Sequence, residues 1–110
     1  MEKVILSGFN MELRRGTMIL SVLSQLREPR YGYALVQCLE EKGFPIDPNT
    51  LYPLLRRLEK QGLLSSEWDL TEAKPRKYYK RTELGSDAYI ELKKTWERMS
   101  LSMAGMLKED

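Results

Sequence analysis

The sequence predicts a mainly α-helical (α+β) fold: a winged helix-turn-helix with a two-stranded wing and a long C-terminal dimerisation helix. Three observations predict it. Leucine-rich segments with helical spacing occupy much of the first sixty residues, two alternating segments joined by a polar loop follow, and the last segment carries a heptad pattern. Three helices followed by a β-hairpin is the winged helix-turn-helix order. We expect residues 1–82 to form this domain and residues 83–110 to form the C-terminal dimerisation helix.

The composition is that of one globular domain. The 110 residues are 42% hydrophobic and 31% charged, which suits one modest core and argues against wholesale disorder. No run of 18 apolar residues occurs, and the apolar patch near the N-terminus is too short for a signal peptide. The single cysteine excludes an intramolecular disulfide. We therefore expect a cytoplasmic protein without a membrane span.

Residues that carry catalytic or metal chemistry are scarce. The chain has no histidine and one cysteine, so neither a zinc site nor a histidine-based catalytic triad can be built. No Gly-rich phosphate loop or paired acids were found in a plausible arrangement. Cys38 falls on the apolar stripe of a predicted helix, where it is interpreted as core packing. We expect no enzyme activity, no metal and no cofactor.

The first helix is predicted over residues 17–26, where five apolar residues repeat at helical spacing: Met18, Ile19, Val22, Leu23 and Leu26. Gly16 leaves open whether this helix extends back through residues 11–16. Residues 4–9 form either a further short helix or an arm.

The second helix is predicted over residues 31–43, with this apolar stripe: Ala34, Leu35, Cys38 and Leu39. Gly43 is a plausible C-terminal stop. The connector FPIDPNT, residues 44–50, follows. Within it Asp47 is a predicted N-cap and Pro48 takes the first helical position.

The third helix is predicted from about residue 48 to residue 61, because four leucines follow the i, i+3, i+4, i+7 rule: Leu51, Leu54, Leu55 and Leu58. Pro53 leaves its start open. Either the helix effectively begins at Thr50, so that Pro53 lies in the first turn, or it begins earlier and is slightly distorted. The face opposite the leucines is polar and cationic: Asn49, Pro53, Arg56, Arg57 and Lys60, with Thr50 and Tyr52 on the flanks.

Residues 63–82 predict a β-hairpin. Residues 63–70 and 77–82 each alternate with a period of two, and the polar, proline-containing segment 71–76 joins them as a turn. An isolated hairpin is barely stable, so this one must pack against the helices.

The final helix begins after Thr82, a predicted N-cap, and carries a heptad seam of about three repeats: Gly85, Tyr89, Leu92, Trp96, Met99, Met103 and Met106. A helix of about 25 residues is roughly 37 Å long. One small domain does not cover such a seam, so we expect a second chain to cover it. The alternative is a helix that folds back on its own core.

Basic side chains concentrate in the third helix and the hairpin. Residues 50–82 hold eight basic and four acidic side chains, although the net charge of the whole chain is only +2. A helix-turn-helix places its second helix in the major groove of DNA, and a wing contacts the backbone. The placement therefore predicts a DNA-binding surface, although any one exposed cation is often merely solvated.

The expected DNA contacts differ in the part of DNA that they reach. At the N-terminal end of the third helix, Asn49, Thr50 and Pro53 are nearest to base edges. Along the rest of the helix, Arg56, Arg57 and Lys60 are expected to bind mostly the phosphate backbone, and Tyr52 offers a hydroxyl group to phosphate. The expected wing contacts, to the phosphate backbone or to a minor groove, are Lys74, Arg76 and Lys77. Tyr31 and Tyr78 are further expected DNA contacts.

Three segments together resemble the PadR-like family of bacterial transcriptional regulators: YGYALVQCLEEKG, NTLYPLLRRLEKQGLLSSEW and KPRKYYKRTELG. The resemblance covers roughly residues 15–90. It implies a homodimeric repressor that binds an inverted repeat in double-stranded DNA, with the last helix as the dimer interface. Because the chain has a single helix after the wing, it is similar to the short subfamily.

The resemblance also implies a possible effector, since some members release DNA when a phenolic or drug-like compound binds. In a short multidrug-sensing relative, a tryptophan of the final helix lines an aromatic pore at the dimer centre, and Trp96 sits comparably. Trp96 and Met99 are then the expected ligand contacts; simple dimer core is the alternative. A second interpretation of the whole chain is a winged-helix adaptor that binds protein instead of DNA.

Overall fold

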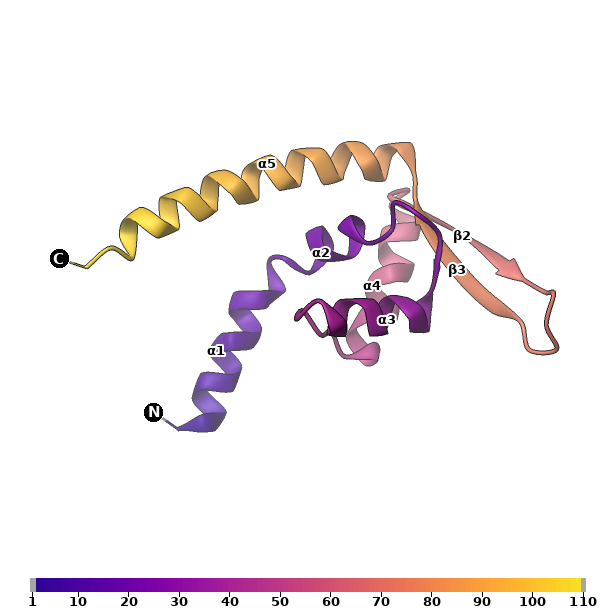
Figure 1. The fold of residues 1–110 in the computed structure, drawn as a ribbon, viewed down its shortest axis with the longest axis horizontal. Helices are drawn as coiled ribbons and strands as arrows, with labels where there is room; N and C mark the ends of the chain where they lie inside the picture. The colour runs from indigo at the N-terminus through magenta and orange to yellow at the C-terminus, as the bar shows by residue number, and fades with distance from the viewer. Residues whose placement is uncertain (1, 110) are drawn as a thin grey trace.

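The computed structural model describes residues 2–109 and confirms the predicted fold class (Figure 1). Five helices and three strands follow one another in this order: α1 (Lys3–Arg15), α2 (Met18–Ser24), β1 (Arg30–Tyr31), α3 (Gly32–Glu41), α4 (Pro48–Lys60), β2 (Leu64–Asp69), β3 (Arg76–Arg81) and α5 (Glu83–Met106). In the part of the chain that is described, no helix is long and apolar enough to cross a membrane.

The hydrophobic core lies where α2, α3 and α4 meet the base of the hairpin. Its buried side chains come from these elements and from the connectors at Leu26 and Ile46: Val22, Leu23, Leu26, Leu35, Leu39, Ile46, Leu51, Leu55, Leu58, Leu64 and Tyr79. The leucine spacing of the third predicted helix is confirmed, because Leu51, Leu55 and Leu58 are fully buried. This packing fixes which face of α4 remains outside.

The helix-turn-helix pair consists of α3 and α4. Asp47 caps α4 as predicted, since its Oδ1 accepts a hydrogen bond from the Asn49 N–H at 2.8 Å. The helix begins at Pro48, so the earlier of the two possible starts is correct and Pro53 lies inside the helix. Proline has no N–H, so α4 lacks one hydrogen bond at this turn. The burial of the leucines stabilises the helix even without that bond.

The sheet has three strands in the order β1-β3-β2, so the predicted two-stranded wing was incomplete. In β1, Arg30 pairs with Tyr79 and Tyr31 pairs with Tyr78 of β3. The second helix therefore begins at Gly32 and not at Tyr31. A strand of two residues is too short to produce a visible alternation in the sequence. The hairpin itself is confirmed, with β2 and β3 antiparallel and the turn at residues 70–75.

Residues 3–15 form a helix of their own, α1, which settles the alternatives for this segment. Gly16 and Thr17 separate it from α2, which is shorter than predicted and ends at Ser24. None of the α1 residues is buried, and six large apolar side chains are exposed: Val4, Ile5, Leu6, Phe9, Met11 and Leu13. The helix projects away from the body of the domain (Figure 1).

The base of α5 is held tightly against the hairpin. Thr82 caps the helix by accepting from the Gly85 N–H at 3.0 Å, as predicted. Gly85 is buried, and a Cβ there would lie 2.0 Å from the carbonyl oxygen of Leu63. From this base α5 packs along α2 and then extends beyond the domain (Figure 1).

Candidate nucleic-acid interface

The face of α4 opposite the core is exposed and cationic. Arg56, Arg57 and Lys60 lie on it, and their side chains form no hydrogen bond or ion pair within residues 2–109. Asn49 and Pro53 are exposed on the preceding turns of the same face. This face therefore presents three long cationic side chains to a polyanion such as DNA. The N-terminus of α4 adds the positive end of the helix dipole.

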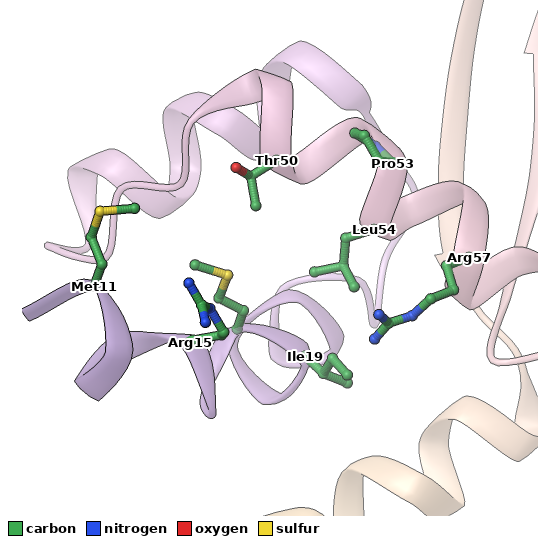
Figure 2. A pocket seen from close by; sticks show the side chains of 8 residues that line it. Met11, Arg15, Ile19, Thr50, Pro53, Leu54 and Arg57 are labelled. Carbon is green, nitrogen blue, oxygen red and sulfur yellow. The ribbon is translucent and has the colours of Figure 1, made fainter. Parts of the chain in front are cut away.

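The two flanks of α4 differ in what they face. At about 100° per residue, Thr50 and Arg57 lie on one flank and Tyr52 and Glu59 on the other. Thr50 and Arg57 border a hollow beside α1 and α2 (Figure 2). Tyr52 and Glu59 face the hairpin, as described next.

Tyr52 is half-buried and packs on the start of α3. A Cβ on Gly32 would lie 2.6 Å from the Tyr52 ring, so only glycine allows this close approach. Tyr52 also borders a shallow hollow of about 320 Å³ together with Tyr33 and Arg76. The Tyr52 ring therefore supports the junction between α3, α4 and the wing.

Arg76, expected on the wing as a free cation, is held by its neighbours. Its guanidinium lies 4.2 Å from the centroid of the Tyr31 ring and donates to Tyr33 Oη at 3.0 Å. It also forms an ion pair with Glu72 at 2.8 Å. Tyr31 in turn stacks on Tyr33 with ring centroids 5.9 Å apart.

Hydrogen bonds to carboxylates of the wing fix Tyr31 of β1 and Tyr78 of β3. Tyr31 donates to Asp69 at 2.5 Å, and Thr71 donates to the same carboxylate through its N–H and its hydroxyl group. The bonds from Thr71 and then from Tyr31 lower the pKa of Asp69 to about 2. The bond to Asp69 raises the pKa of Tyr31, and a bond from Tyr78 to Glu67 at 2.9 Å raises the pKa of Tyr78.

Glu59 joins α4 to the wing. It forms an ion pair with Lys77 at 3.4 Å and accepts a hydrogen bond from Ser66. Lys77 also lies 5.3 Å from the Tyr79 ring centroid and 5.9 Å from that of Trp68. Lys77 is therefore partly engaged within the protein, in the same way as Arg76.

Arg81 contributed to the predicted surplus of positive charge but points inward. It donates to the carbonyl oxygen of Leu23 at 3.0 Å and to Ser86 at 2.9 Å, and it lies over the Tyr89 ring. It joins α2, β3 and α5 and is not part of the exposed cationic surface. Lys74, by contrast, is exposed at the tip of the turn, with no partner among the described residues.

The structure therefore brings the predicted contacts together in two groups. Within residues 2–109, the side chains of Arg56, Arg57, Lys60 and Lys74 have no hydrogen-bond or ion-pair partner. Tyr31, Tyr52, Arg76, Lys77 and Tyr78 instead belong to a wing network of aromatic rings and carboxylates. Sequence reasoning missed Tyr33, Glu59 and Asp69, which complete this network. Asp69 followed two residues later by Thr71 is typical of a turn. The neighbouring sequence did not indicate which residues Tyr33 and Glu59 would contact.

The heptad seam of α5 is largely uncovered. Gly85 is buried and Tyr89 half-buried, but the remaining members are exposed by 39 to 70%: Leu92, Trp96, Met99, Met103 and Met106. Trp96, Tyr89 and Phe44 border a shallow hollow of about 270 Å³ between α2 and α5, with Lys93 at its rim. Met99 is not part of that lining.

No cluster of three or more cysteine, aspartate or glutamate side chains suited to a metal ion occurs among residues 2–109.

Known proteins resemble this chain along most of its length. Residues 19–91 match the model of the transcriptional regulator PadR-like family. The transcriptional regulator Rv3488 of Mycobacterium tuberculosis is 33% identical over 95 residues, which span 86% of this chain and 89% of the relative.

Solved structures agree. A PadR family transcriptional regulator from Eggerthella lenta is 52% identical, with a TM-score of 0.89 over 96% of this chain and 95% of that one. A transcriptional regulator from Clostridium thermocellum is 30% identical, with a TM-score of 0.82 over 88% of this chain and 99% of that one.

Proposed function

This chain belongs to the PadR-like family of transcriptional regulators, and from that premise we propose that it acts as a homodimeric repressor on an inverted-repeat operator. The family consists of DNA-binding regulators and not of enzymes. The observation that carries the proposal is the exposed face of α4, where Arg56, Arg57 and Lys60 have no partner within the described chain. The cytoplasm is the proposed location, because that is where the chromosome of a bacterium lies.

In the proposed complex α4 enters the major groove. Asn49, Thr50 and Pro53 are nearest to the base edges, and the three free cations of α4 contact phosphates on either side. Lys74 at the tip of the turn contacts the backbone of the adjoining groove. Arg76 and Lys77 contact phosphate only with donors that Glu72 and Glu59 leave free, so each contributes less than a free cation.

The wing network has a proposed role in positioning. Tyr31 and Tyr78 are anchored to Asp69 and Glu67, and Tyr52 packs on Gly32. These contacts set the angle between the wing and α4, so the rings act on DNA chiefly through the cations that they orient.

The dimer is proposed to form through α5. Monomeric proteins rarely expose a long contiguous apolar stripe, and the 24 residues of α5 extend it over roughly 36 Å. Helix α1, whose apolar side chains are exposed, extends from the same side of the domain as the free part of α5 (Figure 1). We propose that the α5 seam packs on the seam of the second copy and that α1 covers part of the remaining apolar surface.

A flat aromatic effector is proposed to act at the dimer centre. The Trp96 hollow offers aromatic rings for stacking, and Met99 lies on the same seam, where a flexible thioether packs against varied shapes. A compound held there would change the angle between the two α5 helices and hence the spacing of the two α4 helices. The alternative is that Trp96 is dimer core and no effector binds.

The test is binding to a labelled fragment from upstream of the gene itself, with stoichiometry measured by analytical ultracentrifugation. The proposal expects two chains per site, nanomolar affinity and resistance to a large excess of unrelated DNA. In a reporter strain, deleting the gene that encodes this chain should raise expression from that promoter. Uniformly weak binding to this and to genomic fragments would contradict a specific repressor, and no binding at low salt would favour the protein-binding adaptor.

A further inference from the structure

Arg81 connects the DNA-binding domain to α5 through one side chain. It is the last residue of β3, and its backbone N–H donates to the carbonyl oxygen of Leu26 at 2.9 Å. Its guanidinium donates to the Leu23 carbonyl oxygen at 3.0 Å and to Ser86 Oγ at 2.9 Å. The same guanidinium lies 4.4 Å from the centroid of the Tyr89 ring. The side chain therefore contacts the last turn of α2 and the first two turns of α5.

None of the partners of this half-buried arginine is a carboxylate. Within residues 2–109 Arg81 forms no ion pair. Its charge is stabilised instead by a carbonyl oxygen near the negative end of the α2 dipole and by the face of an aromatic ring. A simple ion pair needs only the charge, whereas these partners need the planar fork of a guanidinium. The contact is therefore directional.

α5 is attached to the domain at two levels. At its start the buried Gly85 packs on the Leu63 carbonyl oxygen, which fixes the position of the helix but not its direction. One turn further, Arg81 holds Tyr89, a half-buried residue that also borders the hollow between α2 and α5. Beyond Tyr89 the large apolar side chains of α5 are exposed, and the helix continues past the domain (Figure 1). Arg81 is therefore placed to fix the direction of the free part of α5.

Small changes in this direction have large effects further along the helix. Leu101 lies about 24 Å along α5 from Gly85, so a tilt of about 10° at the base displaces it by roughly 4 Å. One base pair of DNA occupies about 3.4 Å. A tilt of this size therefore changes the separation of two α4 helices, joined through α5, by about the length of one base pair.

We propose that Arg81 is a positioning residue that sets the direction of α5 and thereby the half-site spacing that the dimer accepts. A dimer gains affinity from its second helix-turn-helix only when both α4 helices reach their half-sites together. The direction of α5 is a property of one chain, whereas the effect on spacing rests on the proposed function.

The first experiment measures the direction of α5 without DNA. Nitroxide labels at Lys42→Cys and Leu101→Cys, in a Cys38→Ser background, report one distance by double electron–electron resonance. Both labelled positions are exposed, one directly after α3 and the other on the face of α5 opposite the seam. Labelled chain is diluted into an excess of unlabelled chain, so that only distances within one chain are recorded. We expect Arg81→Met to shift or broaden the distance distribution by roughly 4 Å.

Lys80→Met is the matched control, because it removes a positive charge from the preceding residue of β3. Lys80 is exposed and has no ion-pair partner in the described part of the chain, so the distribution should stay as in the wild type. Ser86→Ala removes only the acceptor on α5 and should broaden the distribution less than Arg81→Met does. Because it leaves the core intact, it tests the contact even where Arg81→Met does not fold. The proposal is overturned if every folded variant of this contact leaves the distribution unchanged, or if Lys80→Met alters it equally.

The second experiment compares the mapped operator with versions in which one base pair is inserted or removed between the half-sites. The wild type and Lys80→Met should each bind the altered operators at least about tenfold more weakly than the original, and Arg81→Met should reduce this preference to below about threefold. Arg81→Met binding that is weakened by one common factor on all three operators would contradict the role in spacing, because a loss of stability alone acts in that way. A wild type that binds no operator would refute the proposed function and leave the distance result intact, so the two proposals fail separately.

Discussion

Replacing Gly85 by alanine tests how α5 is joined to the domain. The new Cβ would lie 2.0 Å from the carbonyl oxygen of Leu63 and 3.2 Å from Cβ of Arg81. The first contact involves backbone, which does not move aside as the end of a long side chain does. The Leu63 carbonyl also accepts the Thr82 N–H at 3.1 Å, so relieving the clash would disturb the start of α5.

The magnitude follows from two opposing effects. Overpacking costs about 1 to 3 kcal/mol and occasionally more, and a gain in helix propensity of up to about 1 kcal/mol offsets part of it. Because the clash is with backbone, we place the cost at the upper end and expect the free energy of unfolding to fall by about 2 kcal/mol. Urea unfolding followed by circular dichroism, at one fixed protein concentration, measures the change.

Gly105→Ala on the same helix is the matched control. Nothing lies within 4 Å of a Cβ built at Gly105, so this change should be neutral or stabilising by up to about 1 kcal/mol. If Gly85→Ala leaves stability unchanged or raises it as Gly105→Ala does, the close packing of α5 on the Leu63 carbonyl is wrong.

Three further predictions concern separate parts of the molecule. Trp96→Glu should give a monomer in sedimentation velocity, because it places a charge in the proposed seam; a persisting dimer would contradict the seam. The pKa of Asp69 is about 2 in the folded state and about 3.9 in the unfolded state. The Asp69 carboxylate therefore stabilises the fold fully above about pH 4, and this stabilisation is lost as the pH falls through about 2. Asp69→Asn should therefore flatten the acid limb of a stability profile, and an unchanged limb would refute the contribution. Asp47→Ala removes the cap of α4 and should cost about 1 kcal/mol in urea unfolding, with a change below about 0.3 kcal/mol counting against the cap.

The sequence predicts the fold well where burial and spacing coincide. The leucines of α4 recur at helical positions and all but Leu54 are fully buried, and the caps at Asp47 and Thr82 lie where the residue types indicate. These features depend on residues close together in the chain, so the residue types and their spacing predict them. The strand β1 is the exception, since two residues pair with β3 only because the fold brings them there.

The candidate site was less predictable, because charge in a sequence does not reveal its partners. Arg81 and Arg76 look alike in the sequence as free cations, yet one bonds to the Leu23 carbonyl and the other to Glu72 and two tyrosines. Arg56 and Arg57 are also alike in sequence, but only Arg57 borders the hollow beside α1. These differences arise from contacts between segments far apart in the chain, which neither periodicity nor composition encodes.

The salt dependence of DNA binding tests the central claim most directly. Removing a cation that neutralises one phosphate should reduce the slope of log K against log salt by about 0.9. We expect Arg57→Ala and Lys60→Ala each to reduce the slope by about that amount, and Lys77→Ala to reduce it less, because Glu59 already engages that side chain. Lys94→Ala on α5, where Lys94 pairs with Glu91, is the control and should leave the slope unchanged. Equal slopes for the wild type and both α4 variants would contradict the assignment of this face to DNA.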